Sequence, residues 1–559
     1  MLSSNELNRV TDIAWTLVNQ FASQDREVPV EANRGAQIIA DHLRAAGLPV
    51  QMHQPELYLS LPKTAQVQIV GGKTLRAKPP AFTLHCPRGI TGDLIYLPYA
   101  GGGTPLDRSP AALGALGAAR GKIAVIEGFA LPNFIAGLEA AGAIGAIVVN
   151  PGVDIHWGTV STIWGTPELP DLARLPKIPS VAVNQPDGQA LIALAQAGGQ
   201  VVIRTELETG WFPQYLPVVE IPGKDSEDFV LLHGHYDSWR EGVGDNGTGN
   251  ACMLAVALAL WEQRGTLKRG VRIAWWPGHS TGRYGGSAWF ADTFARDLDR
   301  HCVAHLNCDS PGCRWATSYA EIACTAEAAP YVSQVVADVA GQVARGKRPQ
   351  RNSDYTFNNI GVTGLFNASS NIPPEVLAEK GYYVVGGCGG NIAWHTENDT
   401  IEIADRDVLQ KDIALYFAAV AGLAQADQLP FDWRLSAADY IETIAQYQAA
   451  CAFDLTPAAQ AAGTLAAAID ALYAQDLPPA VFNDKVMALS RLLIPAHFTR
   501  GPRFSHDPAL NVPPLPAIAD AMLWHQIPAD QQGFLRAQLM RGQNRLVDVF
   551  ARAAQAVAL

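Results

Sequence analysis

The sequence lacks both a long apolar run and a cluster of positive charge. No stretch approaches the roughly 18 uninterrupted apolar residues that a membrane-spanning helix needs. The first residues, MLSSNELNRVTDIAW, lack the basic segment and apolar segment that together make a secretory signal. The formal net charge is −12 and no basic run is present, which argues against binding to nucleic acid or to an anionic membrane surface. We therefore expect neither a membrane nor a nucleic-acid partner.

The chain also lacks the cysteine spacing of a structural zinc site. Among its eight cysteines, Cys302, Cys308 and Cys313 fall close together but do not form the C-x2-C pairs that such a site uses. A large chain without a secretory signal is expected to keep its thiols reduced. The sequence therefore predicts buried thiols and a cytoplasmic protein.

What the chain does contain is the composition of a globular protein. Hydrophobic residues make up 48% and charged residues 17% of its 559 residues, which excludes a disordered chain. This length exceeds what one hydrophobic core normally supports, so we expect two or three domains.

The stretch 229–261, FVLLHGHYDSWREGVGDNGTGNACMLAVALALW, has the pattern of a metal site. A short apolar run reads as a buried strand, and His235 and Asp237 follow at its end, two residues apart. A glycine-rich turn then carries Asp245 before a long apolar helix. An open α/β sheet places its ligands at this strand edge, and imidazole and carboxylate are ligands that catalytic zinc prefers.

Other polar residues fall near the ends of further predicted strands. Strands are expected at residues 228–233, 271–276, 303–308 and 363–367. His279 and Ser280 follow the second of these strands, and Asp309 follows the third. Asp354 and Tyr355 stand before the fourth, and His395 lies in the later segment WHTENDT. The alternation of strands and helices predicts a mainly parallel sheet.

Two other parts of the chain differ in texture. Between residues 63 and 206, strand-like runs alternate with Gly and Pro turns, and the order GKIAVIEG, helix, GAIGAIVVN, then IPSV resembles the protease-associated domain. From residue 431 to 559 the pattern is helical and Ala-rich, with an irregular Pro-rich interruption.

Taken together, these motifs resemble the zinc aminopeptidase and glutamate carboxypeptidase family, which has the transferrin receptor as a receptor-like relative. The resemblance implies an α/β fold, with a mainly parallel mixed sheet flanked by helices. It divides the chain into a catalytic domain of residues 1–62 and 207–430, an inserted β-rich protease-associated domain of residues 63–206, and a helical domain of residues 431–559. The last domain is expected to form a homodimer.

The resemblance also implies roles for single residues. His235 would bind a metal and Asp237 would be the carboxylate that orients it. Asp245 would bridge two metals, Asp309 would bind the first and His395 the second. The expected cofactor is one or two zinc ions, although another divalent metal is compatible with these ligands.

One motif departs from the family. Where relatives carry two adjacent glutamates, a general base and a metal ligand, this chain has His279 and Ser280 in WWPGHSTGRYGGS. Three interpretations follow. His279 replaces the lost ligand in a two-metal site; or only the site of His235, Asp245 and Asp309 holds a metal and His279 acts as base or electrostatic partner; or catalysis is lost and the fold serves binding. Glu397 and Glu241 are further candidates for proton transfer.

The expected activity is hydrolysis of an amide bond in a small substrate or short peptide. The changed acidic pair favours a small amide, a cyclic amide or an N-acyl amino acid over an ordinary peptide. A catalytically silent binding protein and a metal-dependent lyase or cyclase are the alternatives. Arginines at 283, 314, 348 and 351 are suited to pair with a substrate carboxylate. The residues expected to contact substrate are His156, Trp164, Arg283, Tyr284, Tyr355 and Tyr383.

Overall fold

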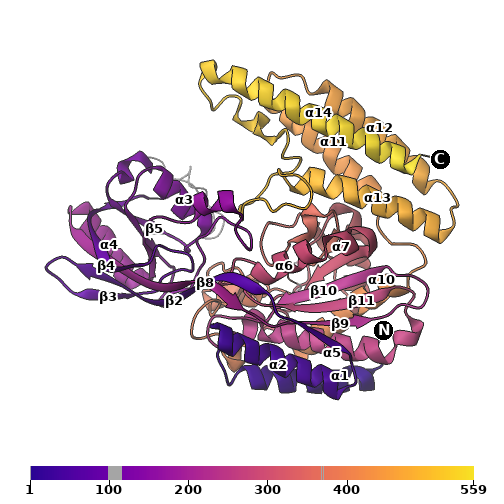
Figure 1. The fold of residues 1–559 in the computed structure, drawn as a ribbon, viewed down its shortest axis with the longest axis horizontal. Helices are drawn as coiled ribbons and strands as arrows, with labels where there is room; N and C mark the ends of the chain where they lie inside the picture. The colour runs from indigo at the N-terminus through magenta and orange to yellow at the C-terminus, as the bar shows by residue number, and fades with distance from the viewer. Residues whose placement is uncertain (1, 99–115, 367, 369, 559) are drawn as a thin grey trace.

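The computed structural model describes residues 2–98, 116–366, 368 and 370–558. They form a six-stranded sheet, a seven-stranded sheet, a short two-stranded ribbon and a C-terminal group of helices (Figure 1). None of the described helices has both the length and the apolar character to cross a membrane. The mixed α/β fold predicted from the sequence is confirmed.

The six-stranded sheet has the order β1-β9-β11-β10-β12-β15. Its strands are β1 (Val50–His53), β9 (Leu216–Ile221), β10 (Phe229–His235), β11 (Gly270–Trp276), β12 (Cys302–Asn307) and β15 (Thr363–Leu365). Strands β11, β10, β12 and β15 run parallel to one another, whereas β9 is antiparallel to both β1 and β11. The carboxyl ends of four strands therefore meet at one edge, where loops can bring polar side chains together.

Helices cover both faces of this sheet, which explains its continuous apolar strands. All seven residues of β10 are buried, as expected for a strand between two layers of helices. In Figure 1, α1, α2 and α5 lie on one face, with α6 and α7 on the other. The helices of this domain are α1 (Ser4–Phe21), α2 (Pro29–Ala45), α5 (Thr248–Glu262), α6 (Gly285–Thr293), α7 (Ala295–His301), α8 (Ala329–Ala340), α9 (Pro374–Lys380) and α10 (Arg406–Gln425).

The seven-stranded sheet has the order β3-β2-β8-β4-β5-β6-β7. Its strands are β2 (Glu56–Ile69), β3 (Thr74–Ala77), β4 (Cys86–Tyr96), β5 (Ile123–Glu127), β6 (Gly145–Val149), β7 (Ser180–Val183) and β8 (Gln200–Pro213), accompanied by α3 (Pro132–Ala140) and α4 (Gln185–Gln196). The long antiparallel pair of β2 and β8 connects this sheet to the first domain. The domain boundaries expected at residues 63 and 206 therefore fall inside continuous strands, and residues 99–115 of the expected domain lie outside the described part.

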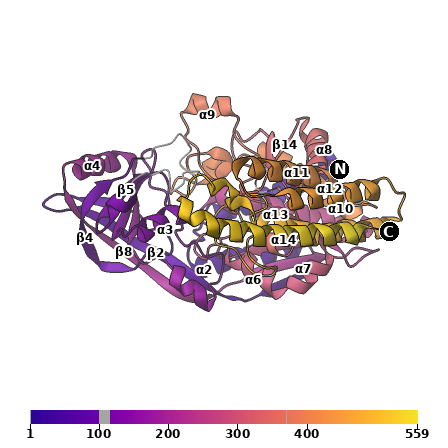
Figure 2. The same ribbon diagram turned by 90° about the horizontal axis from the view of Figure 1, so that it is seen from above.

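The C-terminal helices pack against one another above the first domain (Figure 2). They are α11 (Trp433–Ala450), α12 (Thr456–Tyr473), α13 (Pro479–Phe498) and α14 (Gln532–Val557). Irregular chain between α13 and α14 contacts the loop between β6 and β7, since the main-chain N–H of Ala509 donates to the carbonyl of Thr162 at 2.8 Å.

The strands predicted for the first sheet agree with the structure within two residues at each described end. The differences of two residues are at the first strand, expected to end at 233, which ends at His235, and at the last strand, expected at 363–367, which ends at Leu365; residue 367 lies outside the described part. The short ribbon consists of β13 (Glu321–Ala323) and β14 (Arg345–Lys347), which were not predicted.

Candidate active site

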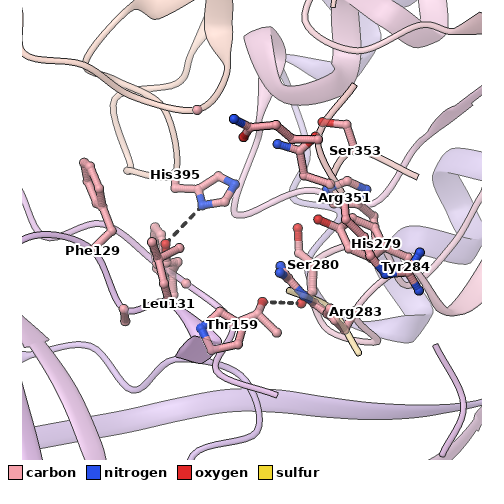
Figure 3. A pocket seen from close by; sticks show the side chains of 18 of the residues that line it. Phe129, Leu131, Thr159, His279, Ser280, Arg283, Tyr284, Arg351, Ser353 and His395 are labelled. Atoms are coloured by element: carbon pink, nitrogen blue, oxygen red, sulfur yellow. Dashed lines mark hydrogen bonds between the residues drawn. The ribbon is translucent and has the colours of Figure 1, made fainter. Parts of the chain in front are cut away.

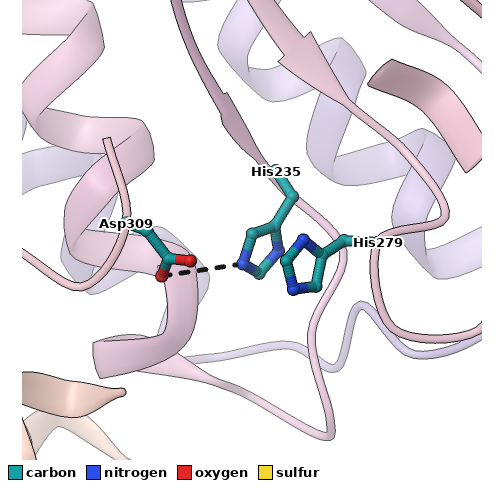
Figure 4. Close-up of side chains that lie close together, drawn as sticks. All are labelled: His235, His279 and Asp309. Carbon is teal, nitrogen blue, oxygen red and sulfur yellow. Dashed lines mark ion pairs between the residues drawn. The ribbon is translucent and has the colours of Figure 1, made fainter. Parts of the chain in front are cut away.

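The candidate site lies at the carboxyl edge of the six-stranded sheet. His235 is the last residue of β10, while His279 and Asp309 follow β11 and β12 by a few residues. The ligand atoms that these three residues offer all lie within 4.8 Å of one another (Figure 4). Adjacent parallel strands thus bring together residues that are far apart in the sequence.

Asp245 is the centre of this cluster. Its Oδ1 lies 3.1 Å from Nε2 of His235, and its Oδ2 lies 3.2 Å from Nε2 of His395. Oδ1 of Asp309 is 3.8 Å from Nε2 of His235. Burial alone would raise the pKa of the Asp245 carboxyl, but the two histidines bring it well below its ordinary value. Asp245 is therefore an ionised carboxylate that faces an imidazole on each side.

Both histidines are oriented by hydrogen bonds on the opposite side of the ring. Nδ1 of His235 lies 2.9 Å from the carbonyl oxygen of Asp237, and Nδ1 of His395 lies 3.0 Å from that of Trp157. A carbonyl only accepts, so each Nδ1 carries a proton and each Nε2 is the atom directed at Asp245. Burial lowers the pKa of His235, but the Asp245 and Asp309 carboxylates raise it well above its ordinary value, so a metal ion bound at Nε2 would displace a proton. A proton on Nδ1 is what a metal ligand that binds through Nε2 requires.

The cluster fits a metal ion because it contains buried ligand atoms that lack a hydrogen-bond partner. Nε2 of His235 and Oδ1 of Asp245 are buried, and neither has a hydrogen-bond partner among the described residues. Buried polar atoms without a partner destabilise a protein unless a ligand or ion satisfies them. Their separation of 3.1 Å is close to that of two ligands on one zinc ion, about 3.3 Å for bonds of about 2 Å in a tetrahedron.

Asp237 acts differently from the predicted role. Its carboxylate Oδ1 is 3.9 Å from Nδ1 of His235, too far for a hydrogen bond, and its main-chain carbonyl orients the ring instead. The carboxylate accepts the main-chain N–H groups of His279 at 3.0 Å and Ser280 at 3.2 Å. The carboxylate of Asp237 therefore fixes the loop that follows β11.

His279 forms an imidazole–carboxylate pair with Asp354. Its Nδ1 lies 2.6 Å from Oδ2 of Asp354, whose side chain is fully buried. Ser287 donates to Oδ1 of the same carboxylate at 2.5 Å. Burial would raise the pKa of Asp354, but His279 and the Ser287 hydrogen bond lower it overall, so the carboxylate is ionised. The His279 ring stacks on His235 with centroids 3.7 Å apart.

Asp399 is a site residue that the sequence analysis missed. Its carboxylate accepts the main-chain N–H of Gly244 at 2.6 Å and that of Asp245 at 2.9 Å. Burial raises the pKa of Asp399 to about 7, with a further contribution from the charge of Asp245. Asp399 thus positions the loop that carries Asp245. Its place in the same WHTENDT segment as His395 was the available signal.

A cavity of about 660 Å³ opens above the cluster, a volume suited to a small substrate. Asp245, Asp309, His279 and His395 lie on its wall. Of the six residues predicted to contact substrate, Arg283 and Tyr284 line this cavity (Figure 3). Of the other arginines considered, Arg351 also lines it.

His156 and Tyr383 do not line the cavity, which corrects their predicted role. His156 is 1% exposed, with Nδ1 2.6 Å from the carbonyl of Trp394 and Nε2 2.9 Å from the hydroxyl of Tyr383. Burial lowers the pKa of His156 to about 3, so the ring is neutral. His156 thus contacts Trp394, which lines the cavity, and Tyr383 holds His156 in turn.

Trp164 and Tyr355 are also packing residues and not wall residues. The Trp164 ring lies 4.0 Å from that of Tyr284, and its indole N–H donates to the hydroxyl of Thr356 at 3.1 Å. Tyr355 is fully buried against His305, with ring centroids 4.6 Å apart. Within the same segments, Trp157, Thr159 and Ser353 line the cavity instead.

Comparison with known proteins relates this domain to peptidases. Residues 218–420 match the sequence model of Peptidase family M28. Leucine aminopeptidase 2 of Trichophyton equinum is 31% identical over 180 residues, which cover 31% of this chain and 33% of the relative. Carboxypeptidase Q of Xenopus laevis is 34% identical over 123 residues, 21% of this chain and 26% of the relative. The chain thus spans about a third or less of the length of these relatives.

Solved structures share the fold over a larger part of the chain. A zinc aminopeptidase from Bacillus subtilis has a TM-score of 0.55 at 20% identity, covering 75% of this chain and 96% of that one. An aminopeptidase from Aneurinibacillus sp. strain AM-1 has a TM-score of 0.54 at 16% identity, covering 76% and 96%. Every member of the histidine and aspartate cluster lies within residues 218–420, the part of this chain that matches the model of Peptidase family M28.

Proposed function

We propose that this protein is a metal-dependent hydrolase of amide bonds in small substrates. The observation that carries the proposal is Asp245, whose two carboxylate oxygens each face Nε2 of a histidine that is oriented by a main-chain carbonyl. This arrangement suits an ion on each side of the carboxylate. The match to Peptidase family M28 supports hydrolysis of a C–N bond.

Zinc is the proposed cofactor, with one or two ions per chain. His235, Asp245 and Asp309 would hold the first ion, and Asp245 with His395 would hold the second. Zinc supplies Lewis acidity, which polarises the amide carbonyl and makes bound water acidic near neutral pH. Ser280 is a poorer ligand than a glutamate at this position, so the second ion would be bound more weakly than the first.

We assign proton transfer to His279. Asp354 accepts the proton of Nδ1, so Nε2 is left free to take a proton from water and to deliver it to the leaving nitrogen. The carboxylate also stabilises the imidazolium that forms, as in other imidazole–carboxylate pairs. Glu397 is a poor alternative because Arg76 and Lys78 bind its carboxylate. His279 as a direct ligand of the metal remains the competing hypothesis.

Metal analysis is the first test. Protein incubated with zinc and freed of excess metal should retain one or two ions per chain and should lose thermal stability when a chelator removes them. Protein that binds no metal tightly, and whose melting temperature does not respond to chelation, would contradict the hydrolase proposal.

A catalytically silent binding protein is the second candidate. The observation in its favour is Ser280, which stands where relatives are expected to have an acidic ligand. Such a protein would bind ligands in the same cavity without turnover. A lyase or cyclase on the same residues would instead produce turnover without adding water to the product.

The remaining proposals concern the other parts of the chain. We infer that the seven-stranded sheet is a protease-associated domain, because it follows the segments that carry that resemblance. The helical domain would form the homodimer, and exposed apolar side chains on it, such as Phe534 and Met540 on α14, suit an interface. All eight cysteines are free thiols, which favours a reducing, cytoplasmic location.

A further inference from the structure

Two arginines line the cavity without a carboxylate partner. In the described part of the chain, neither Arg283 nor Arg351 forms an ion pair with a protein carboxylate, and Nε of Arg283 is buried with no hydrogen-bond partner. Burial lowers the pKa of Arg351 to about 10, so this group is still a cation at neutral pH. Arg283 is half-buried, and buried Arg351 donates to the main-chain carbonyls of Asp507 and Pro508, which are neutral. A guanidinium removed from water normally finds an anion, so two whose charge no carboxylate of the described residues offsets point to an anionic ligand.

Aromatic contacts join these arginines to His279 in one wall. The His279 ring packs edge-on against Tyr284, with centroids 4.8 Å apart. The Arg283 guanidinium carbon lies 4.9 Å from the centre of the Tyr284 ring. That of Arg351 lies 4.1 Å from the Trp164 ring, which in turn packs on Tyr284. The cationic wall is therefore continuous with the group assigned to proton transfer, as Figure 3 also shows.

The charges of the cavity disfavour a substrate with a free amine. Among the described residues that line it, the acidic side chains are Asp245 and Asp309, and both belong to the proposed metal cluster. The two arginines offset these two charges, so a divalent cation would leave the cavity positively charged. A substrate ammonium would then lack a carboxylate partner, whereas a substrate carboxylate would find two guanidinium groups.

The opposite part of the cavity is apolar. Phe129 and Leu131 line it (Figure 3), and Trp394 also lines the cavity. Phe129 and Trp394 pack edge to face with centroids 5.5 Å apart. Apolar side chains of this kind suit an uncharged acyl group, since they cannot satisfy a buried charge.

We propose that the substrates are N-acylated amino acids or N-blocked short peptides whose free carboxylate is bound by Arg283 and Arg351. This inference rests on the proposed hydrolase function. The carboxylate belongs to the leaving amine, because the arginines share a wall with His279, which delivers a proton to that nitrogen. Water adds its oxygen to the acyl carbon and the C–N bond breaks. One proton goes to the nitrogen, and the products are a carboxylic acid and an amino acid.

Three matched probes separate the possible substrate classes with the zinc-loaded, full-length protein. N-benzoyl-leucine has a free carboxylate and a blocked amine, N-benzoyl-leucinamide lacks the charge, and leucine 4-nitroanilide has a free amine and no carboxylate. We expect kcat/KM for benzoate release to be about tenfold to a hundredfold higher for the acid than for its amide. Leucine 4-nitroanilide should be a poor substrate.

Arg283→Gln is the principal variant, because the Arg283 side chain has no protein hydrogen bond or ion pair to lose in the described part of the chain. It should reduce the preference for the acid about tenfold or more while zinc content stays unchanged. Arg351 also holds the chain through the carbonyls of Pro508, at 2.8 Å from Nε, and Asp507, so Arg351→Lys, which keeps the charge, is used for the second cation in place of a neutral residue. Arg296→Gln, at an exposed site, is the control.

Equal kcat/KM for the acid and its amide, a preference for leucine 4-nitroanilide, or an unchanged preference in Arg283→Gln would overturn the proposal. If no probe is hydrolysed, the hydrolase function fails. The carboxylate site is then decided by calorimetry with N-benzoyl-leucine and its amide: tighter binding of the acid that is lost in Arg283→Gln supports it, and equal binding overturns it.

Discussion

At the scale of single residues, the cluster depends on one carboxylate with two neighbours. Asp245 lies 3.1 Å from one imidazole nitrogen and 3.2 Å from another, and Asp399 fixes the loop that carries it through two main-chain hydrogen bonds. The arrangement is demanding because the cluster is almost completely buried. Small changes at Asp245 should therefore affect metal binding far more than folding.

Asp245→Asn should abolish tight metal binding. The amide keeps the shape of the side chain. It removes the negative charge that would attract the metal ions, and it replaces one of the two ligand oxygens by an NH2 group that cannot bind a metal. We expect zinc affinity to fall by more than about 100-fold, since even an indirect partner of a ligand contributes about 10- to 100-fold. Titration with a chromophoric chelator measures this affinity, and an unchanged zinc affinity in the variant would contradict the assignment.

Asp354→Asn should slow turnover without removing the metal. An asparagine can donate to Nδ1 of His279 and so favour the wrong tautomer, with the proton on Nε2. We expect kcat to fall about 10²- to 10⁴-fold with little change in KM or zinc content. Asp354→Glu should restore part of the rate.

The control for this variant is Asp292→Asn. Asp292 also pairs with a histidine, at 2.9 Å from His506, but it is exposed and lies outside the cavity wall. Normal activity in Asp292→Asn together with normal activity in Asp354→Asn would show that His279 needs no carboxylate partner.

At the scale of elements, the loop after His395 is held by the seven-stranded sheet. Glu397 pairs with Arg76 at 2.5 Å and with Lys78 at 2.6 Å. Lys78 also donates to the carbonyl of Ile155 at 2.6 Å and lies 3.3 Å from the centre of the Trp157 ring. The carbonyl of Trp157 is the one that orients His395. One lysine thus connects the two sheets beside the site.

Lys78→Ala should loosen this connection. Lys78 is buried but Glu397 is 41% exposed, so water replaces part of the interaction and we expect a loss of about 1–3 kcal/mol in stability. Because burial lowers the pKa of Lys78 to about 8, the folded state binds this proton less tightly than the unfolded state. Calorimetry at pH 7 should show a lower melting temperature for the variant, and zinc should bind to it more weakly. A variant with wild-type stability would show that the lysine contributes nothing.

The sequence predicted the place of site residues better where they lie next to regular elements than where they lie within irregular loops. His235, His279 and Asp309 follow buried strands, and parallel strands bring their ends to one edge, so their proximity was predictable. In the loop at 151–170, Trp157 and Thr159 line the cavity in place of the expected residues. Side chains in irregular chain do not alternate with a fixed period, so the sequence does not show which of them face a site. His156 and Trp164 were therefore assigned to the wrong side.

Backbone conformation explains the error at Tyr355 and the missed role of Asp354. Ser353 and Asp354 both have left-handed φ values, +46° and +53°, which reverse the chain between the cavity wall and the core. No sequence pattern marks such a reversal at non-glycine residues. The pairing of Asp354 with His279 also spans 75 positions, and no local pattern predicts it.

At the scale of the whole molecule, buried neutral histidines make stability depend on pH. Burial lowers the pKa of His156 and His233 to about 3 and that of His497 to about 4, and it also lowers that of His305 well below its ordinary value. Between these values and about 6.5, the unfolded chain binds protons that the folded chain does not. Stability from these groups is therefore present above about pH 6.5 and is lost as pH falls toward 4 or 3.

The contribution of these histidines to the stability of the metal-free protein should fall as pH decreases from 6.5 to 4. Burial raises the pKa of Glu27 and of Asp399 to about 7, which gives these carboxyl groups the opposite dependence, so the test compares variants with the wild type. Each such histidine contributes up to about 1.4 kcal/mol per pH unit in this range. His497→Gln should make the dependence shallower, whereas His525→Gln, at an exposed position, should not. A difference in melting temperature between His497→Gln and the wild type that stays constant from pH 6.5 to 4 would contradict the assignment of a neutral buried His497.

The most direct measurement of the central claim is oxygen labelling of the product. Zinc-loaded protein is incubated with N-benzoyl-leucine in water enriched in oxygen-18, and the benzoate is analysed by mass spectrometry. Metal-dependent hydrolysis predicts one labelled oxygen in each new carboxylate, no product after chelation, and recovery when zinc is restored. Product without label, or labelled product that forms equally well after the metal is removed, would contradict the account.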